Sequence, residues 1–116
     1  MILYQGQERH VVKTLLDTGC TIALINQETV KRLGIQQSQR KNPIRIENYT
    51  GEVVEDAGKW CTEPMRLQHR NHYTKERFDV SPMDPEIDIF LPFWWIDKHT
   101  PQGPWNLREV RFDSPN

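Results

Sequence analysis

The sequence has 116 residues and a mass of 13.8 kDa, which is the size of one ordinary domain. Hydrophobic residues make up 36%, and six glycines do not raise this to the roughly 45–50% typical of globular chains, so the chain would profit from burying more surface in a dimer. Fifteen Lys and Arg against sixteen Asp and Glu give a formal net charge of −1, which argues against a nucleic-acid-binding protein.

The first predicted element is a β-hairpin over residues 1–16. Two apolar runs flank a polar tip that contains Gly6, and the β-branched residues of the runs favour strands. A turn over Asp17–Thr21 and a short strand over Ile22–Ile25 are expected to follow.

The next segment carries the one clear helix signal. Asn26 is expected to cap a helix over Gln27–Leu33, and Gly34 is expected to end it. The polar, basic stretch 36–42 is predicted to be a solvated loop.

The rest of the chain is predicted to form short strands separated by polar turns. The expected strand segments are 44–46, 53–54, 60–67, 77–80, 87–91 and 105–112. A polar loop is expected over 68–75, and the last residues are expected to fray. The total of about seven strands and one short helix predicts a small β-barrel or sandwich.

Membrane, secretion and metal signals are weak in this sequence. No apolar run approaches the roughly 20 residues of a membrane span, and Met1–Leu3 leads straight into polar sequence, so neither a span nor a signal peptide is expected. Two cysteines make no disulfide framework, which favours a reducing, cytoplasmic compartment. His69, His72 and Cys61 lack a fourth ligand at a recognisable spacing, so no metal site is predicted.

The motif with the most chemical meaning is Asp17-Thr18-Gly19, directly after an apolar strand. A half-buried carboxylate there is costly and needs a reason, and Gly19 allows another group to approach closely. The same tripeptide is also a common turn at the end of a strand. The motif alone therefore leaves a catalytic carboxylate and a simple turn open.

The context of this motif resembles the retropepsin-like aspartic proteases, in particular those of Ty3/gypsy-type retrotransposons. The similarity runs through nearly the whole chain in order. Its parts are Val12–Gly34 around Asp-Thr-Gly, Pro43–Gly51 with Ala57-Gly58, Phe78–Val80, Asp88–Leu91, and Trp95-Ile96 with His99–Pro101 and Trp105.

The resemblance implies one mostly β domain over residues 1–116, a small closed β-barrel with one short helix after the active-site turn, working as a homodimer. Asp17 would be the catalytic residue and would share a proton with its copy in the partner. Thr18 and Gly19 would complete the active-site loop. The residues implied to bind substrate are Cys20, Thr21, Asn48, Tyr49, Thr50, Gly51, Ile89, Phe90 and Leu91.

The implied activity is an aspartic endopeptidase that cleaves polyprotein peptide bonds without a metal or cofactor. The expected partners are a second copy of the chain and a peptide or polyprotein substrate, with neither nucleic acid nor a membrane. The terminal strands Met1–Tyr4 and Val110–Phe112 are expected to build the sheet shared by the dimer.

Two alternatives remain open. Pro92 stands where the family has Gly and removes a backbone donor, which favours an inactive dimer of the same fold that binds peptides or serves in assembly. Cys20 also replaces the usual Ala or Ser. A third reading is a monomeric β-barrel binding module in which Asp17 is only a turn residue.

Overall fold

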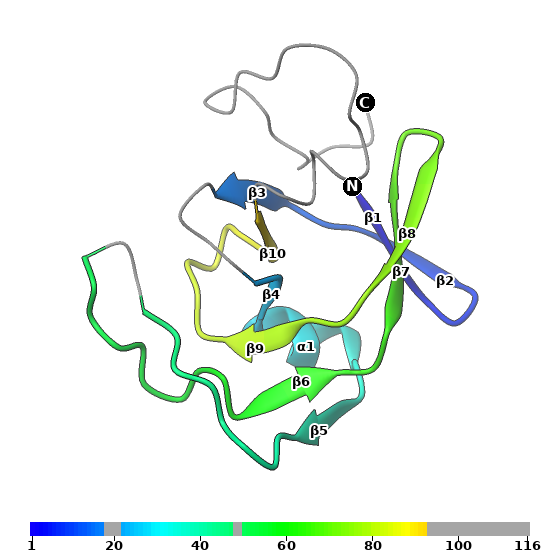
Figure 1. Cartoon of the computed structure of the whole chain (residues 1–116). Coiled ribbons are helices and arrows are strands. Elements are labelled where there is room, and N and C mark those ends of the chain that lie inside the picture. Colours follow the sequence, from blue (N-terminus) through cyan, green and yellow to red (C-terminus); the bar gives the residue numbers. More distant parts are fainter. Residues whose placement is uncertain (18–21, 48–49, 93–116) are drawn as a thin grey trace.

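A computed structural model describes residues 1–17, 22–47 and 50–92. This part of the chain is mostly β-structure with one short helix (Figure 1). The elements are β1 (Ile2–Gln5), β2 (Glu8–Val11), β3 (Thr14–Asp17), β4 (Leu24–Asn26), α1 (Gln27–Leu33), β5 (Gln37–Gln39), β6 (Trp60–Thr62), β7 (Met65–His69), β8 (His72–Glu76), β9 (Asp79–Ser81) and β10 (Ile89–Pro92). No helix within these residues is long and apolar enough to cross a membrane.

The strands form two sheets. One has four antiparallel strands in the order β2-β1-β7-β8, and the other has six in the order β3-β10-β4-β9-β6-β5. The chain passes from the first sheet to the second at Val12 and Lys13, between β2 and β3. In the described residues neither sheet has its two end strands paired with each other, so each sheet keeps two edge strands and the expected closed barrel is not seen.

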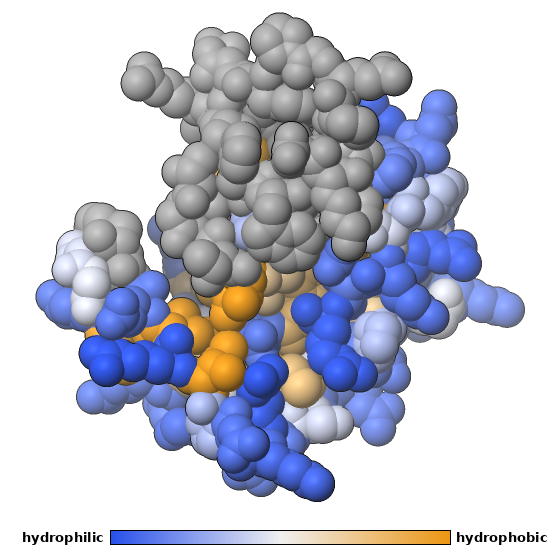
Figure 2. Space-filling view, in the orientation of Figure 1, coloured by the Kyte–Doolittle hydropathy of each residue, from blue (hydrophilic) through white to orange (hydrophobic). Residues whose placement is uncertain are grey.

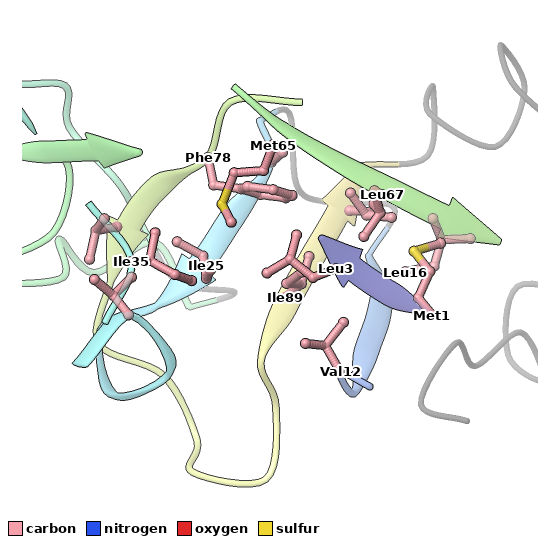
Figure 3. Packing of buried hydrophobic residues seen from close by; sticks show 14 residues of the cluster. Met1, Leu3, Val12, Leu16, Ile25, Ile35, Met65, Leu67, Phe78 and Ile89 are labelled. Carbon is pink, nitrogen blue, oxygen red and sulfur yellow. The ribbon is translucent and has the colours of Figure 1, made fainter. Parts of the chain in front are cut away.

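The core lies between the two sheets (Figure 3). Leu3 on β1 and Leu67 on β7 point from the four-stranded sheet toward Ile25 and Ile89 of the other sheet, and all four side chains are fully buried. Phe78, also fully buried, lies beside Met65 at one end of the core. This apolar interior fixes the six-stranded sheet on which the candidate site is built.

The predicted helix and its caps are confirmed. The Asn26 side-chain oxygen accepts a hydrogen bond from the Glu28 N–H at 3.1 Å, and Gly34 adopts a left-handed φ of 64° at the C-terminal end. The Asn26 amide also donates to the carbonyls of Asp84 and Ile87, at 3.1 and 2.8 Å. The capping residue therefore also holds the segment that leads into β10.

Two predicted polar loops contain strands. The stretch 68–75 belongs to the β7–β8 hairpin, in which His69 pairs with His72 across a tight turn, and Arg70 has a φ of 55°. The stretch 36–42 contains β5, an exposed edge strand paired with β6. Both predictions were wrong because these strands expose polar side chains to solvent, and backbone pairing alone marks them as strands.

The expected role of Met1–Tyr4 in a shared dimer sheet is also wrong. Ile2–Tyr4 pairs with β2 on one side and with β7 on the other. A strand with both edges occupied has no backbone groups left for a partner strand. The second expected terminal strand, Val110–Phe112, lies outside the described residues.

Candidate active site

Asp17 is the last residue of β3, in the six-stranded sheet. Strand β10 runs parallel to β3 on one side and antiparallel to β4 on the other. Thr14 and Leu16 of β3 are buried, at 3% and 6% exposure. The backbone of Asp17 is thus placed at the end of a strand that the core anchors.

Pro92 is the residue in register with Asp17 on β10. It is buried and is the final residue of the strand, so its missing N–H falls where regular pairing ends. The strand geometry continues through Pro92, and β10 keeps its pairing with β3 from Ile89 to this point.

A second hydrophobic cluster lies apart from the main core, on the side of the sheet that carries loop 44–57. Its members come from the loop, from β4 and the segment before it, and from β10 and the segment before it. They are Leu24, Ile46 and Ala57, which are buried, with the partly buried Ile22, Ile44, Val54, Met83 and Phe90. Hydrophobic surface is visible between loop 44–57 and strands β4 and β10 (Figure 2). The cluster provides an apolar wall beside the strand end that carries Asp17.

Loop 44–57 is built as a short antiparallel hairpin. Glu47 pairs with Val53, and the Val54 N–H donates to the Ile46 carbonyl at 2.8 Å. Thr50 and Gly51 are exposed at its tip, and Gly51 has a φ of 86°, a conformation that glycine adopts without strain. The hairpin therefore has an exposed turn at its tip and apolar residues of the second cluster, Ile44, Ile46 and Val54, at its base.

Gly58 fixes the position of this hairpin. Its carbonyl accepts from the Ile44 N–H at 3.0 Å, and its own N–H donates to the Val80 carbonyl at 3.1 Å. A Cβ atom at Gly58 would lie 2.2 Å from the Ile44 carbonyl oxygen. Only glycine lets the two backbones come this close.

The structure places some of the predicted site residues and leaves others outside its description. Thr18, Gly19, Cys20, Thr21, Asn48 and Tyr49 lie outside the described residues. Ile89 and Leu91 are fully buried in the main core, whereas Phe90 packs on the second cluster. Side chains alternate along a strand, so of these three only Phe90 faces the apolar wall.

The sequence interpretation missed the loop and β4 residues of this wall. Ile44 and Ile46 alternate with polar residues just before the hairpin tip, and that spacing was the available signal. Nothing local marked Met83 as part of this wall, because it reaches the cluster only in the folded chain.

Asp88 anchors the start of β10 to β3 and α1. Its Oδ1 accepts from the Thr29 hydroxyl at 2.6 Å and from Arg32 at 3.0 Å, and its Oδ2 accepts from the Lys13 N–H at 2.9 Å. Burial raises the pKa of Asp88, but these hydrogen bonds and the Arg32 charge outweigh it, so the pKa lies below its usual value. The buried carboxylate thereby holds β3 and β10 in the register that sets Asp17 beside Pro92.

Replacing Asp88 with Asn is expected to lower the free energy of unfolding by about 2–3 kcal/mol at pH 7, because charge-assisted hydrogen bonds are lost. The depressed pKa means that this stabilisation is complete above the unfolded-state pKa of about 3.9 and is lost as the pH falls through the lower folded-state pKa. The difference between the variant and the wild type should therefore shrink on acidification.

Urea unfolding at neutral and acidic pH measures this difference. Asp56→Asn is the matched control. Among the described residues the Asp56 side chain forms a single, exposed pair with Lys59 at 3.3 Å, so this substitution should lower the free energy of unfolding by less than about 0.5 kcal/mol. Two results would contradict the role given to Asp88. One is an equal loss of unfolding free energy in the two variants, and the other is a difference between Asp88→Asn and the wild type that grows at low pH.

No group of three or more His, Cys, Asp or Glu residues is arranged to hold a metal ion in the described part of the chain. His69 and His72 face each other across the end of the β7–β8 hairpin, while Cys61 lies on β6 in the other sheet. Burial, followed by the charge of Arg70, lowers the pKa of His69 to about 4.

Comparison with protein families gives a match to the model of the PEG10/RTL1 protease domain over residues 13–116. The matched region begins just before β3 and contains Asp17, loop 44–57 and β10. No solved structure matches the chain.

Proposed function

Because the chain belongs to the PEG10/RTL1 protease domain family of retropepsin-like aspartic proteases, we propose that it is an aspartic endopeptidase that works as a homodimer and cleaves a polyprotein. The observation that carries this proposal is the position of Asp17. The residue ends a strand anchored in the core, beside β10 and near an apolar wall under an exposed hairpin. The proposed unit is a single protease domain over residues 1–116.

The proposed chemistry needs two carboxylates. The 116 residues contain one Asp-Thr-Gly, and in the proposed homodimer the second carboxylate is the Asp17 of the other copy. Two such groups on a two-fold axis share one proton, because two ionised carboxylates at close range repel each other. The pair then titrates as a unit.

Each member of the pair has a distinct task in one catalytic cycle. The ionised Asp17 takes a proton from a water molecule, which attacks the carbonyl carbon of the peptide bond, while the protonated Asp17 of the other copy donates to the carbonyl oxygen. When the resulting gem-diol collapses and the C–N bond breaks, the leaving nitrogen takes the proton that the first Asp17 removed from the water. A gem-diol hydroxyl gives its proton to the Asp17 of the other copy, which restores the starting state. No step of this scheme calls on a metal or cofactor.

The substrate is proposed to lie extended between the apolar wall and the 44–57 hairpin. Phe90 offers an apolar contact from the wall, and the hairpin tip at Asn48–Gly51 closes over the peptide and excludes water. Thr18 and Gly19 are proposed to support the carboxylate, and Cys20 and Thr21 to line the groove beside it.

The alternative, an inactive dimer of the same fold, was motivated by Pro92. Strand β10 includes Pro92 and is paired with β3 from Ile89 to Pro92, which lies opposite Asp17. The proline therefore does not break the pairing between β10 and β3. Nothing else in the described residues favours the inactive reading over the protease.

Two experiments test the proposal. One is sedimentation across protein concentrations, with and without a statine-type peptide analogue, and the other is an assay of peptide cleavage at mildly acidic pH. The analogue imitates the tetrahedral transition state and contacts both carboxylates, so it should shift the chain toward dimer and block cleavage. A chain that neither cleaves peptide nor responds to the analogue in its association would refute the endopeptidase.

A further inference from the structure

The four-stranded sheet has a face that points away from the core. Because side chains alternate along a strand, the residues next to the buried Leu3 and Leu67 project to the opposite side. Strand register collects eight residues there, called the outer face below. They are Ile2, Tyr4, Arg9, Val11, Arg66, Gln68, Tyr73 and Lys75.

The outer face carries cations and no acidic residue. Arg9, Tyr4, Arg66 and Lys75 form one row in register across all four strands, and the three cations of this row are exposed. The ion pairs formed among the described residues involve none of the three. The net charge of −1 gives the chain as a whole no attraction for nucleic acid, but these three exposed cations concentrate positive charge on one surface.

Two of these cations sit directly opposite each other. Arg66 on β7 pairs in register with Lys75 on β8, and like charges at such positions destabilise a sheet. A sheet face shaped for stability alone would place an acidic residue at one of the two positions. A bound anion removes this repulsion, so the row is suited to a polyanionic ligand.

The same face presents two aromatic rings, those of Tyr4 and Tyr73, which are in contact with Arg66. The Arg66 guanidinium lies 5.6 Å from the ring centre of Tyr4 and 5.7 Å from that of Tyr73, and the two ring centres are 6.3 Å apart. The Tyr4 hydroxyl donates to Oε1 of Gln68. Tyr73 is 52% exposed, so its ring is available for stacking.

We propose that the outer face binds single-stranded nucleic acid. Arg9, Arg66 and Lys75 contact backbone phosphates, and a base stacks on Tyr73. Four-stranded sheets that present aromatic rings beside cations are suited to unpaired bases, because every base has a flat face to stack. An acidic polypeptide would use the cations but would gain nothing from the exposed ring.

The position of the outer face leaves the candidate active site open. The strands β1, β2, β7 and β8 lie together on the right of Figure 1, whereas loop 44–57 lies on the left. The surface on that right-hand side is hydrophilic in Figure 2, unlike the apolar wall beside the loop. Binding at this face does not depend on protease activity, so the proposal stands or falls separately from the proposed function.

Fluorescence anisotropy with a labelled single-stranded oligouridylate of about 15 nucleotides tests the proposal at low salt. Replacing Arg9, Arg66 and Lys75 together with Gln should weaken binding at least about tenfold. The matched control replaces Lys31, Lys41 and Lys59 with Gln, which removes the same charge from exposed positions elsewhere and should change the affinity less than about twofold. For the wild type, the logarithm of the affinity should fall with the logarithm of the salt concentration at a slope of about −2.

A second pair of variants separates stacking from charge. Tyr73→Ser should weaken oligouridylate binding about fivefold or more, whereas Tyr73→Phe keeps the ring and should bind as the wild type does. Polyglutamate should compete poorly, and duplex of equal length should bind more weakly than the single strand. The proposal would be overturned by the absence of binding at low salt, by equal losses of affinity in the two triple variants, or by a Tyr73→Ser protein that binds as the wild type does. If Tyr73→Ser binds normally and polyglutamate competes strongly, the outer face would be assigned to acidic polypeptides instead.

Discussion

Replacing Asp17 with Asn is expected to abolish peptide cleavage, with kcat/KM lowered by about 10⁴-fold or more. In the proposed homodimer this one substitution removes both carboxylates. An amide neither accepts the proton of the attacking water nor donates one to the carbonyl oxygen as a carboxylic acid does. Peptide hydrolysis by purified wild-type and variant protein, followed at mildly acidic pH, measures the effect.

The fold is expected to survive this change. Asn matches Asp in shape, and losing a pair of mutually repelling carboxylates should leave the dimer as stable as before or more so. Glu8→Gln, at an exposed position on β2 of the other sheet and outside the proposed substrate groove, serves as the activity control and should cleave at close to the wild-type rate. Cleavage that persists in a well-folded Asp17→Asn protein would remove Asp17 from the catalytic role.

The second large effect is expected on stability, from Gly58→Ala. The added Cβ would meet the Ile44 carbonyl oxygen at 2.2 Å, and the φ of 77° at this position is unfavourable for alanine. Overpacking against rigid backbone and a left-handed conformation together should lower the free energy of unfolding by about 3 kcal/mol. Urea unfolding monitored by tryptophan fluorescence gives this value.

Gly34→Ala separates the two causes. Gly34 has a similar φ of 64°, but no atom lies within 4 Å of where its Cβ would be, so only the conformational cost of about 1 kcal/mol should appear. The excess at Gly58 then measures the close approach of the two backbones. Equal losses at the two glycines would show that the contact with Ile44 relaxes at little cost.

Gly58→Ala should also affect the proposed substrate groove. The glycine ties the base of the 44–57 hairpin to β9 through its hydrogen bond to Val80. A displaced base would shift the apolar wall that Ile44 and Ile46 share with Phe90. For residual folded protein, a rise in KM is therefore expected along with the loss of stability.

Local chemistry let the sequence determine several elements by itself. Asn26 and Gly34 define α1, because capping and a left-handed end involve groups only a few residues apart. Gly6 defines the β1–β2 turn in the same way. The order of motifs around Asp17 was enough to indicate the family, since it depends on the order of residues along the chain and needs no knowledge of their contacts.

Tertiary structure alone decided which of these elements meet. Asp88 finds its partners Lys13, Thr29 and Arg32 far away in the sequence, and no local pattern selects them. The inward position of Ile89 and Leu91 and the opposite position of Phe90 follow from which sheet face packs on the core. The physical reason is that caps and turns are satisfied within one segment, whereas strand pairing and burial are satisfied only by segments that folding brings together.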